Sequence, residues 1–418
     1  MWESGGMGGK RRDRQYVSSE ACVLWGIYGQ SGHTEKQLNT IYMQCDERYA
    51  LYIDISGLSL YNILSKVQYF GKGEVFLKLN NYFKQFVANI SLNPTRIEKI
   101  NSAVRNWKKK FKEDDEIKEI FVDYYTQGSY STDTGVRPKS GEEFDVDVVL
   151  VMDIDEEDDP KDILHHIKDR IKSHKEYEDR VKVKDRCVRI EYAKEFHVDV
   201  VPAFEYDCCI KIPSKKEKEW TKTNPSGFKD WCDDINTESE QYFSQIVKIL
   251  KHWRDNNVGK DTAPKSILLT TLAGNAFTKK SSIAETLVET LDVMVNDIEE
   301  LLFWLSEDDD VPFVKNPSLQ DENLARNWTK LKAQRFLNKL KSLKDSCQEA
   351  LDEANKDKSI EKWQNIFGKN YFPSELSEAS AMANTIQKGS AFVSSTGALN
   401  KESGYPLKDH RFYGTDTE

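Results

Sequence analysis

The sequence lacks any apolar run long enough to cross a lipid bilayer. A membrane-spanning helix needs about 18 or more consecutive apolar residues, and no such run occurs in the 418 residues. The N-terminus also lacks the apolar core of a secretory signal peptide. These two absences argue against membrane and secreted proteins. We expect a soluble protein of the cytoplasm with no membrane partner.

The cysteines show no pattern of a disulfide framework or a zinc site. The seven of them form no CxxC pair and lie near no histidine cluster: Cys22, Cys45, Cys187, Cys208, Cys209, Cys232 and Cys347. An odd number without regular spacing argues against both structures. We therefore expect reduced thiols.

The charge balance is acidic rather than basic. The chain has 60 Lys and Arg against 70 Asp and Glu, a formal net charge of −10. A protein that coats nucleic acid over its whole surface needs the opposite sign. Only a local basic groove remains compatible with this composition.

Residues 1–77 read differently from the rest of the chain. They open with the Gly- and Arg-rich stretch Gly5–Arg14 and show no sustained periodicity. Two interpretations are open. The segment is either a poorly packed N-terminal extension or lies upstream of the true start. In the second case, the codons of residues 72–74 would form a ribosome-binding sequence just before an alternative start at Val75 or Leu77.

The remaining chain is predicted to form three parts, namely a core over residues 78–206 that is β-rich from about residue 120, a helical lobe over 207–373 and a flexible tail over 374–418. Apolar residues at helical spacing follow the cap Asn93-Pro94. The other expected elements are a helix over 162–173, a hairpin of 188–192 with 196–201, and, where the pattern turns helical after Asp207, helices over 241–254, 266–277, 283–305 and 324–354. The fold class is α+β.

Three aspartates on two predicted strands are the most informative residues. Asp145 and Asp147 alternate with valines in the strand Phe144–Val151, so both should point to one face while the valines enter the core. Asp199 lies in an otherwise apolar strand, where an acid is costly unless something compensates it. A Gly-Ser pair at 128–129 precedes these strands in a predicted turn.

Three such carboxylates beside a Gly-Ser turn suit two-metal nucleotidyl transfer. Two Mg²⁺ ions, with Mn²⁺ as an alternative, would lie about 4 Å apart and clamp the attacking and leaving oxygens. Asp145 and Asp147 would hold both ions, and Asp199 would complete the site. Gly128 and Ser129 would hold triphosphate oxygens. Taken singly, the features also describe an ordinary turn, an edge strand and a structural acid, and we interpret the nearby His197 as structural.

The same segments resemble a known family, the bacterial cyclic GMP–AMP synthase/dinucleotide-cyclase-like nucleotidyltransferases of the DNA polymerase β superfamily. These are the second-messenger oligonucleotide or dinucleotide synthetases. The similar runs are Gln127–Pro138, Asp145-Val146-Asp147, His197–Ala203, Lys248–Arg254 and Pro264–Leu269. A late run, Trp363–Gly368, also fits, most closely the group called clade D. The resemblance covers roughly residues 78–373.

The resemblance implies a fold and further site residues. The fold is a polymerase-β-like nucleotidyltransferase core with a mixed or antiparallel sheet, packed on a C-terminal helical lobe. Gln127, Gly128 and Ser129 would line the donor triphosphate, and the three aspartates would hold metal. Lys251 and Ser266 would reach phosphate oxygens from the helical lobe. The zinc-binding insertion of the animal DNA sensor is absent, so no direct activation by double-stranded DNA is expected.

The implied activity is synthesis of a cyclic di- or trinucleotide second messenger from NTPs, ATP among them, in anti-phage defence. Two alternatives remain open. A template-independent RNA-tailing enzyme would need a basic surface, which the net charge of −10 disfavours. A catalytically dead interaction module is disfavoured by the presence of all three acids.

The C-terminal tail resembles the substrates of a ubiquitin-like conjugating enzyme encoded in such defence operons. His410–Gly414 follows a Ser- and Gly-containing stretch that would let it extend from the body. Residues 415–418 follow the glycine, unlike tails that end in the residue to be activated. The alternatives are removal of these residues, use of Glu418 itself, or a tail that is only a flexible end.

Overall fold

The computed structural model describes most of the chain after residue 78. The described ranges are 23–28, 40–44, 50–54, 79–139, 142–192, 195–306, 310–377, 382, 385–386, 392–394, 399–400 and 405–406. The chain separates into two compact units, Met1–Val75 and Phe76–Glu418.

The first unit contains a small antiparallel sheet. Its strands are β1 (Val23–Tyr28), β2 (Thr40–Gln44) and β3 (Ala50–Asp54), with β2 in the middle. The stretch Gly5–Arg14 and the alternative starts at residues 75 and 77 lie outside the described residues. The interpretation of residues 1–77 as an extension or a misassigned start therefore stays a prediction.

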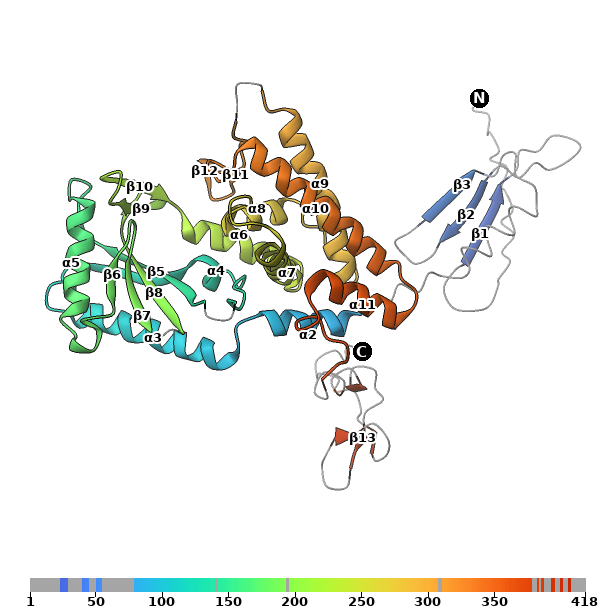
Figure 1. Cartoon of the computed structure of the whole chain (residues 1–418), viewed down its shortest axis with the longest axis horizontal. Helices are drawn as coiled ribbons and strands as arrows, with labels where there is room; N and C mark the ends of the chain where they lie inside the picture. Colours follow the sequence, from blue (N-terminus) through green and yellow to red (C-terminus); the bar gives the residue numbers. More distant parts are fainter. Residues whose placement is uncertain are drawn as a thin grey trace, which may run out of the picture. The chain divides into compact units, whose positions relative to one another are not determined.

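The second unit begins with a mixed sheet, coloured teal to green in Figure 1. Within the described residues seven strands join in it, and the main path runs β10-β9-β8-β5-β4. β7 pairs with β8 and β6 with β7, and only β5 and β8 run parallel. The strands are β4 (Phe121–Gln127), β5 (Phe144–Met152), β6 (Val181–Val183), β7 (Val188–Tyr192), β8 (Phe196–Tyr206), β9 (Cys209–Ser214) and β10 (Glu219–Thr223).

One face of this sheet is covered by two helices, α3 (Pro94–Glu113) and α5 (Pro160–Lys172) (Figure 1). Val146 and Val148 are fully buried in the same core cluster as Trp107 of α3 and Leu164 of α5. The predicted direction of the β5 valines is therefore confirmed.

Several predicted elements are confirmed with their capping residues. Helix α3 begins at Pro94, and the Asn93 side chain accepts a hydrogen bond from the amide of Arg96. Helix α5 matches the predicted 162–173 closely but begins two residues earlier, capped by Asp159, and ends one residue earlier at Lys172. The hairpin of β7 and β8 pairs antiparallel as expected, although residues 193–194 of its turn lie outside the described residues.

The prediction that the pattern turns helical directly after Asp207 is wrong. Strands β9 and β10 follow, and β9 pairs with the end of β8, so the sheet continues to Thr223. The connecting turns place Asp207 and Lys218 at positive φ, 52° and 57°. Neither position carries a glycine, and the β9–β10 connection is a charged Lys/Glu run. The usual sequence signal of a hairpin is therefore missing.

A second correction concerns the predicted helix over 324–354. Helix α10 spans Lys330–Leu351, and a short hairpin of β11 (Lys315–Asn316) and β12 (Leu319–Asn323) precedes it. The Asn323 side chain accepts hydrogen bonds from the amides of Val314 and Ala325 and thereby fixes a turn. Thr329 then caps the helix through the amide of Lys332.

The rest of the described unit is mainly a helical lobe with its own core. Its helices are α2 (Asn80–Ile90), α6 (Pro225–Glu238), α7 (Tyr242–Asn257), α8 (Ser266–Asn275), α9 (Ile283–Phe303), α10 and α11 (Lys356–Phe367). Helix α2 precedes the sheet in sequence yet packs with α11 (Figure 1), where Phe83 contacts Trp363 and Phe372 edge-on. Helix α7 is buried on nearly every side and includes buried Lys248 and Lys251.

Toward the C-terminus three two-residue strands pair antiparallel, β13 (Phe392–Val393) with β14 (Leu399–Asn400) and β15 (Tyr405–Pro406). The motif His410–Gly414 lies outside the described residues, so the role of the tail stays a prediction. Among the helices that the structure describes, none is both long and apolar enough to cross a membrane.

Candidate active site

The strand register brings the predicted acids together on one face of the sheet. Asp147 of β5 lies directly beside Asp199 of β8 in the parallel pair, where neighbouring strands are about 4.8 Å apart. Gln127 of β4 lies beside Asp147 on the other side, and Arg189 of β7 lies beyond Asp199. Gln127, Asp147, Asp199 and Arg189 thus form one row across four strands, which we call the acid row. Asp145 lies two residues before Asp147 on the same face of β5, beside His197 of β8.

The Gly-Ser turn lies against this row. Strand β4 ends at Gln127, and the single-turn helix α4 (Gly128–Ser131) follows at once. Gly128 has a φ of +68°, and a Cβ atom there would come within 2.8 Å of Oδ2 of Asp147. Glycine is needed on both counts, because another residue would be strained and would collide with the carboxylate.

Asp147 carries a poorly compensated charge. Burial and, after it, the neighbouring Asp199 and Asp145 carboxylates together raise the pKa of Asp147 to about 7, against weaker opposition from His197 and Arg189. Within the described residues no hydrogen bond or ion pair reaches its side chain. The site therefore concentrates negative charge at a point where the fold supplies no direct partner.

Asp145 is paired with a histidine that sequence reasoning treated as structural. Its side chain is 63% exposed, and Oδ1 lies 2.5 Å from Nε2 of buried His197. The contact is an ion pair when the ring is protonated. It lowers the pKa of Asp145. The other ring nitrogen lies 3.2 Å from Oε2 of Glu143, so His197 stands between two carboxylates.

Asp199 is held by Arg189, a residue that sequence reasoning missed. Nε of Arg189 donates to Oδ1 at 2.8 Å and Nη2 donates to Oδ2 at 2.7 Å. The signal was available in the predicted hairpin, whose register places residue 189 opposite residue 199. With Asp199 and Asp145 both engaged, no three His, Cys, Asp or Glu side chains of the described residues are already grouped to hold a metal ion.

Lys251 reaches the Gly-Ser turn through a loop. Its Nζ donates to the carbonyl and to Oγ1 of Thr134, at 3.1 and 2.8 Å. The Thr134 hydroxyl lies 2.9 Å from that of Thr132, which in turn donates to the carbonyl of Gly128. Burial, followed by the charge of Arg254, lowers the pKa of Lys251 to about 7. The lysine thus anchors the loop that follows the turn.

Ser266 stands apart from this network. It is the exposed first residue of α8, and its described hydrogen bond is accepted from Nη1 of Arg254 at 3.2 Å. The structure therefore brings Gln127, Gly128 and the three aspartates together and links Lys251 to them. No described contact brings Ser266 to the acid row.

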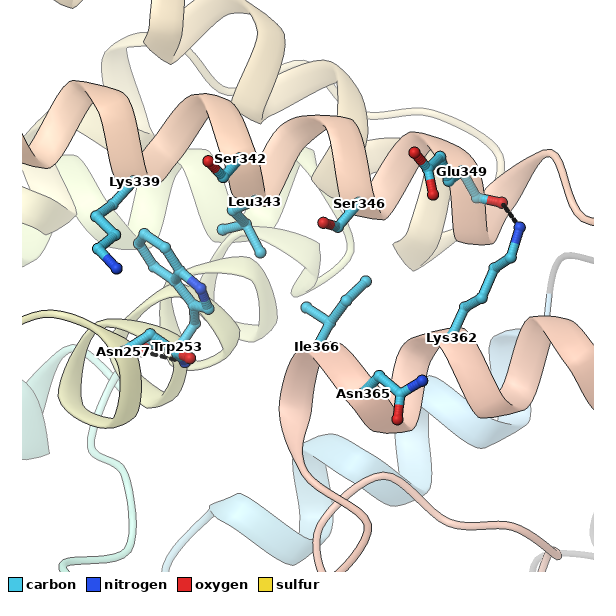
Figure 2. Close-up of a pocket in the computed structure, with 10 residues that line it drawn as sticks. All are labelled: Trp253, Asn257, Lys339, Ser342, Leu343, Ser346, Glu349, Lys362, Asn365 and Ile366. Atoms are coloured by element: carbon cyan, nitrogen blue, oxygen red, sulfur yellow. Dashed lines mark hydrogen bonds between the residues drawn. The ribbon is translucent and has the colours of Figure 1, made fainter.

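A separate groove of about 380 Å³ lies in the helical lobe, between α7, α10 and α11 (Figure 2). Trp253 and Asn257 of α7 face Lys339 and Ser342 of α10 across it. A second cavity of about 390 Å³ shares the last two residues. Neither is lined by a predicted site residue.

Two family models match consecutive parts of the chain. Residues 77–236 match the second messenger oligonucleotide or dinucleotide synthetase domain, and residues 241–380 match the C-terminal domain of cyclic GMP-AMP synthase. The chain belongs to the second messenger oligonucleotide or dinucleotide synthetases. The motif-based family prediction is thereby confirmed, together with the enzyme class, a nucleotidyltransferase.

Relatives with named activities are similar over most of their length. A c-di-GMP synthase of Roseivirga ehrenbergii is 27% identical over 360 residues, which cover 77% of this synthetase and 94% of the relative. A cyclic AMP-AMP-AMP synthase of Acinetobacter is 25% identical over 328 residues, covering 77% and 93%.

Solved structures show the same fold. The Bradyrhizobium diazoefficiens CD-NTase CdnG in complex with GTP aligns with a TM-score of 0.58 at 18% identity, covering 73% of this chain and 98% of that one. The E. coli CdnC complex with HORMA also gives 0.58, at 17% identity, covering 70% and 97%. The predicted α+β nucleotidyltransferase fold is confirmed.

The residues of the synthetase fit a divalent metal by their chemistry. Three carboxylates supply the hard oxygen ligands that Mg²⁺ and Mn²⁺ prefer. Asp147 is the clearest candidate ligand. A bound cation would compensate its charge and lower its raised pKa.

Proposed function

We propose that the synthetase joins NTPs and cyclises them into a di- or trinucleotide second messenger, with ATP among its substrates. The observation that carries this proposal is the position of Asp147. It lies between Asp199 and Gln127 and against the Gly128 backbone, and no side chain in the described part of the chain forms an ion pair with it. A nucleotide whose phosphates bind the Gly-Ser turn would lie directly beside the acids.

The chain's own residues have distinct proposed roles. Asp145, Asp147 and Asp199 would hold two Mg²⁺ ions, with Mn²⁺ as a substitute. Bound metal would supply charge stabilisation for in-line attack of a ribose hydroxyl on an α-phosphate with pyrophosphate leaving. Gln127, Gly128 and Ser129 would hold the triphosphate through side chains and close backbone approach. Ser266 is retained as a nucleotide contact on the family resemblance alone.

For Lys251 the geometry supports a role other than direct phosphate binding. Both of its hydrogen bonds go to Thr134. The Thr134 hydroxyl is hydrogen-bonded to that of Thr132, which also contacts the carbonyl of Gly128. We infer that it positions the triphosphate turn, and that a bound phosphate would draw it only by replacing these bonds.

The biological setting belongs to the same proposal. The family resemblance supports a signal generator for anti-phage defence, acting in the cytoplasm where its NTP substrates are. A ubiquitin-like conjugating enzyme would act on the C-terminal tail. Removing residues 405–418 should leave basal synthesis unchanged in vitro and lower partner-dependent activation in cells. Loss of basal synthesis would show instead that the tail is needed by the enzyme itself.

Product analysis tests the proposed activity. The purified chain is incubated with Mg²⁺ and four labelled NTPs, and phosphatase-resistant products are identified by mass spectrometry. A cyclic di- or trinucleotide supports the proposal. Extension of an added RNA without a cyclic product would favour the RNA-tailing alternative, and no product under any NTP mixture would favour an inactive interaction module.

A further inference from the structure

The Asp199 carboxylate has both oxygens occupied by one guanidinium. Nε and Nη2 of Arg189 donate to Oδ1 and Oδ2 at 2.8 and 2.7 Å, the parallel two-bond arrangement that makes arginine–carboxylate pairs strong. The Asp199 side chain is 9% exposed and that of Arg189 is 24% exposed, so water screens the pair only weakly.

Asp199 lies between a cation and an acid in the acid row. On one side is Arg189 of β7, and on the other is Asp147 of β5, whose side chain has no described hydrogen bond or ion pair. The strand register holds all three backbones in place. What can change is the partner of the Asp199 carboxylate. It can bind the Arg189 guanidinium or a cation placed beside Asp147.

A metal shared by Asp147 and Asp199 needs at least one Asp199 oxygen. Both oxygens are donated to by Arg189, and no three described His, Cys, Asp or Glu side chains are grouped to hold an ion. Each oxygen keeps a second lone pair, but a metal that used it would lie beside the positive guanidinium, so ligation by Asp199 favours opening at least one arm of the bidentate pair.

We propose that Arg189 is a positioning residue that competes with metal for Asp199, stabilising the metal-free sheet and lowering its affinity for divalent cations. This inference rests on the proposed role of Asp199 as a metal ligand. Without metal, Arg189 supplies the only direct cationic contact described for the carboxylates of the acid row. With metal, the guanidinium gives up one or both hydrogen bonds. The synthetase is thereby kept folded without metal at the cost of weaker metal binding.

Metal binding by variants tests the competition without any catalytic readout. Mn²⁺ is titrated into the full chain without nucleotide, and free Mn²⁺ is followed by electron paramagnetic resonance. Arg189→Gln should tighten Mn²⁺ binding by about tenfold or more, because a charge-assisted hydrogen bond no longer has to break. Arg189→Lys, which cannot form the two-armed contact, should lie between wild type and Arg189→Gln.

Thermal unfolding gives an independent readout of the same variants. Metal-free Arg189→Gln should unfold at a lower temperature than wild type, and added Mn²⁺ should raise its midpoint by more than it raises that of wild type. Lys182→Gln is the matched control for the loss of a positive charge on the same face, because Lys182 lies opposite Arg189 in the β6–β7 pair but its ion pair is with Glu191 and not with an acid of the acid row. It should leave Mn²⁺ affinity unchanged.

Unchanged or weaker Mn²⁺ binding by both Arg189 variants would overturn the competition. If Arg189→Gln does not fold, Arg189→Lys carries the test alone. Adding Asp147→Asn to Arg189→Gln separates the two levels of the hypothesis, since it should abolish the tightened binding. If Mn²⁺ binding is insensitive to Asp147→Asn, the metal assignment itself is wrong and the role of Arg189 falls with it.

Discussion

The two faces of the central sheet use the same strands for opposite purposes. On β5, Val148 and Leu150 are fully buried against α3 and α5, in a cluster that gains stability from apolar contact. Asp145 and Asp147 alternate with them on the other face, where burial works against the charged form. One face stabilises the fold along its whole length, whereas the other sacrifices stability for chemistry at the acids and becomes apolar again at Val149 and Val151. Substitutions on the two faces should therefore separate folding from function.

Asp147→Asn should produce the largest effect on function. It removes one negative charge and one proposed metal ligand, so synthesis should fall by at least about a thousandfold. The same change relieves the crowding of acids, and the unfolding temperature should stay the same or rise. Product yield and thermal unfolding of the same preparation check both halves. Synthesis at the wild-type level would contradict the metal assignment.

Leu150→Ala should produce the converse result. Loss of a fully buried side chain between the sheet and two helices should lower the free energy of unfolding by about 2–5 kcal/mol. Mn²⁺ affinity of the folded protein should change little, because Leu150 lies on the face away from the acids. Urea unfolding and a Mn²⁺ titration provide the measurements. A large loss of metal affinity at full folding would show that the two faces are not independent.

The acid face should also respond to pH in a range where the apolar face does not. Below the pKa of Asp147, about 7, its carboxyl group holds a proton that metal must displace. Mn²⁺ binding should therefore weaken as pH falls, by about tenfold for each unit below 7. Titrations at pH 6 and pH 8 give the comparison. Asp147→Asn should flatten the dependence, and an equally steep dependence in that variant would assign it to another group.

The smallest effect is expected far from both faces. Lys339 lines the groove between α7 and α10 and touches neither the acid row nor the Gly-Ser turn (Figure 2). Lys339→Ala should leave product yield and unfolding temperature close to those of wild type. A clear change in yield would mean that this groove influences the active site.

The candidate site was largely predictable because its signals are local. Alternation along a strand indicated that Asp145 and Asp147 share a face, and the hairpin of β7 and β8 was readable from β-branched residues and a short turn. Helix α3 was equally clear from its Asn-Pro cap and apolar spacing. Strands β9 and β10 were not predicted, because their turns lack glycine and their positive φ values fall on Asp207 and Lys218.

Partner choice across the sheet required the tertiary structure. The register of the predicted hairpin already places residue 189 opposite residue 199. That the Arg189 guanidinium binds both oxygens of Asp199 is shown by the structure. His197 was interpreted as structural, yet its ring contacts Asp145 and Glu143. Lys251 was expected to reach phosphate, but its partner is Thr134, which is remote in sequence.

Local sequence patterns were enough to identify which residues could do the chemistry. Period-two alternation set the acids on one face, glycine allowed the turn to approach them, and the acidic composition disfavoured an extended nucleic-acid surface. The contacts of each charged group follow from the assembled fold. Pairing of Asp199 with Arg189 depends on strand register, and isolation of Asp147 depends on which strands flank it. Charge–charge energies fall with distance and rise with burial, and both quantities exist only once the strands are assembled.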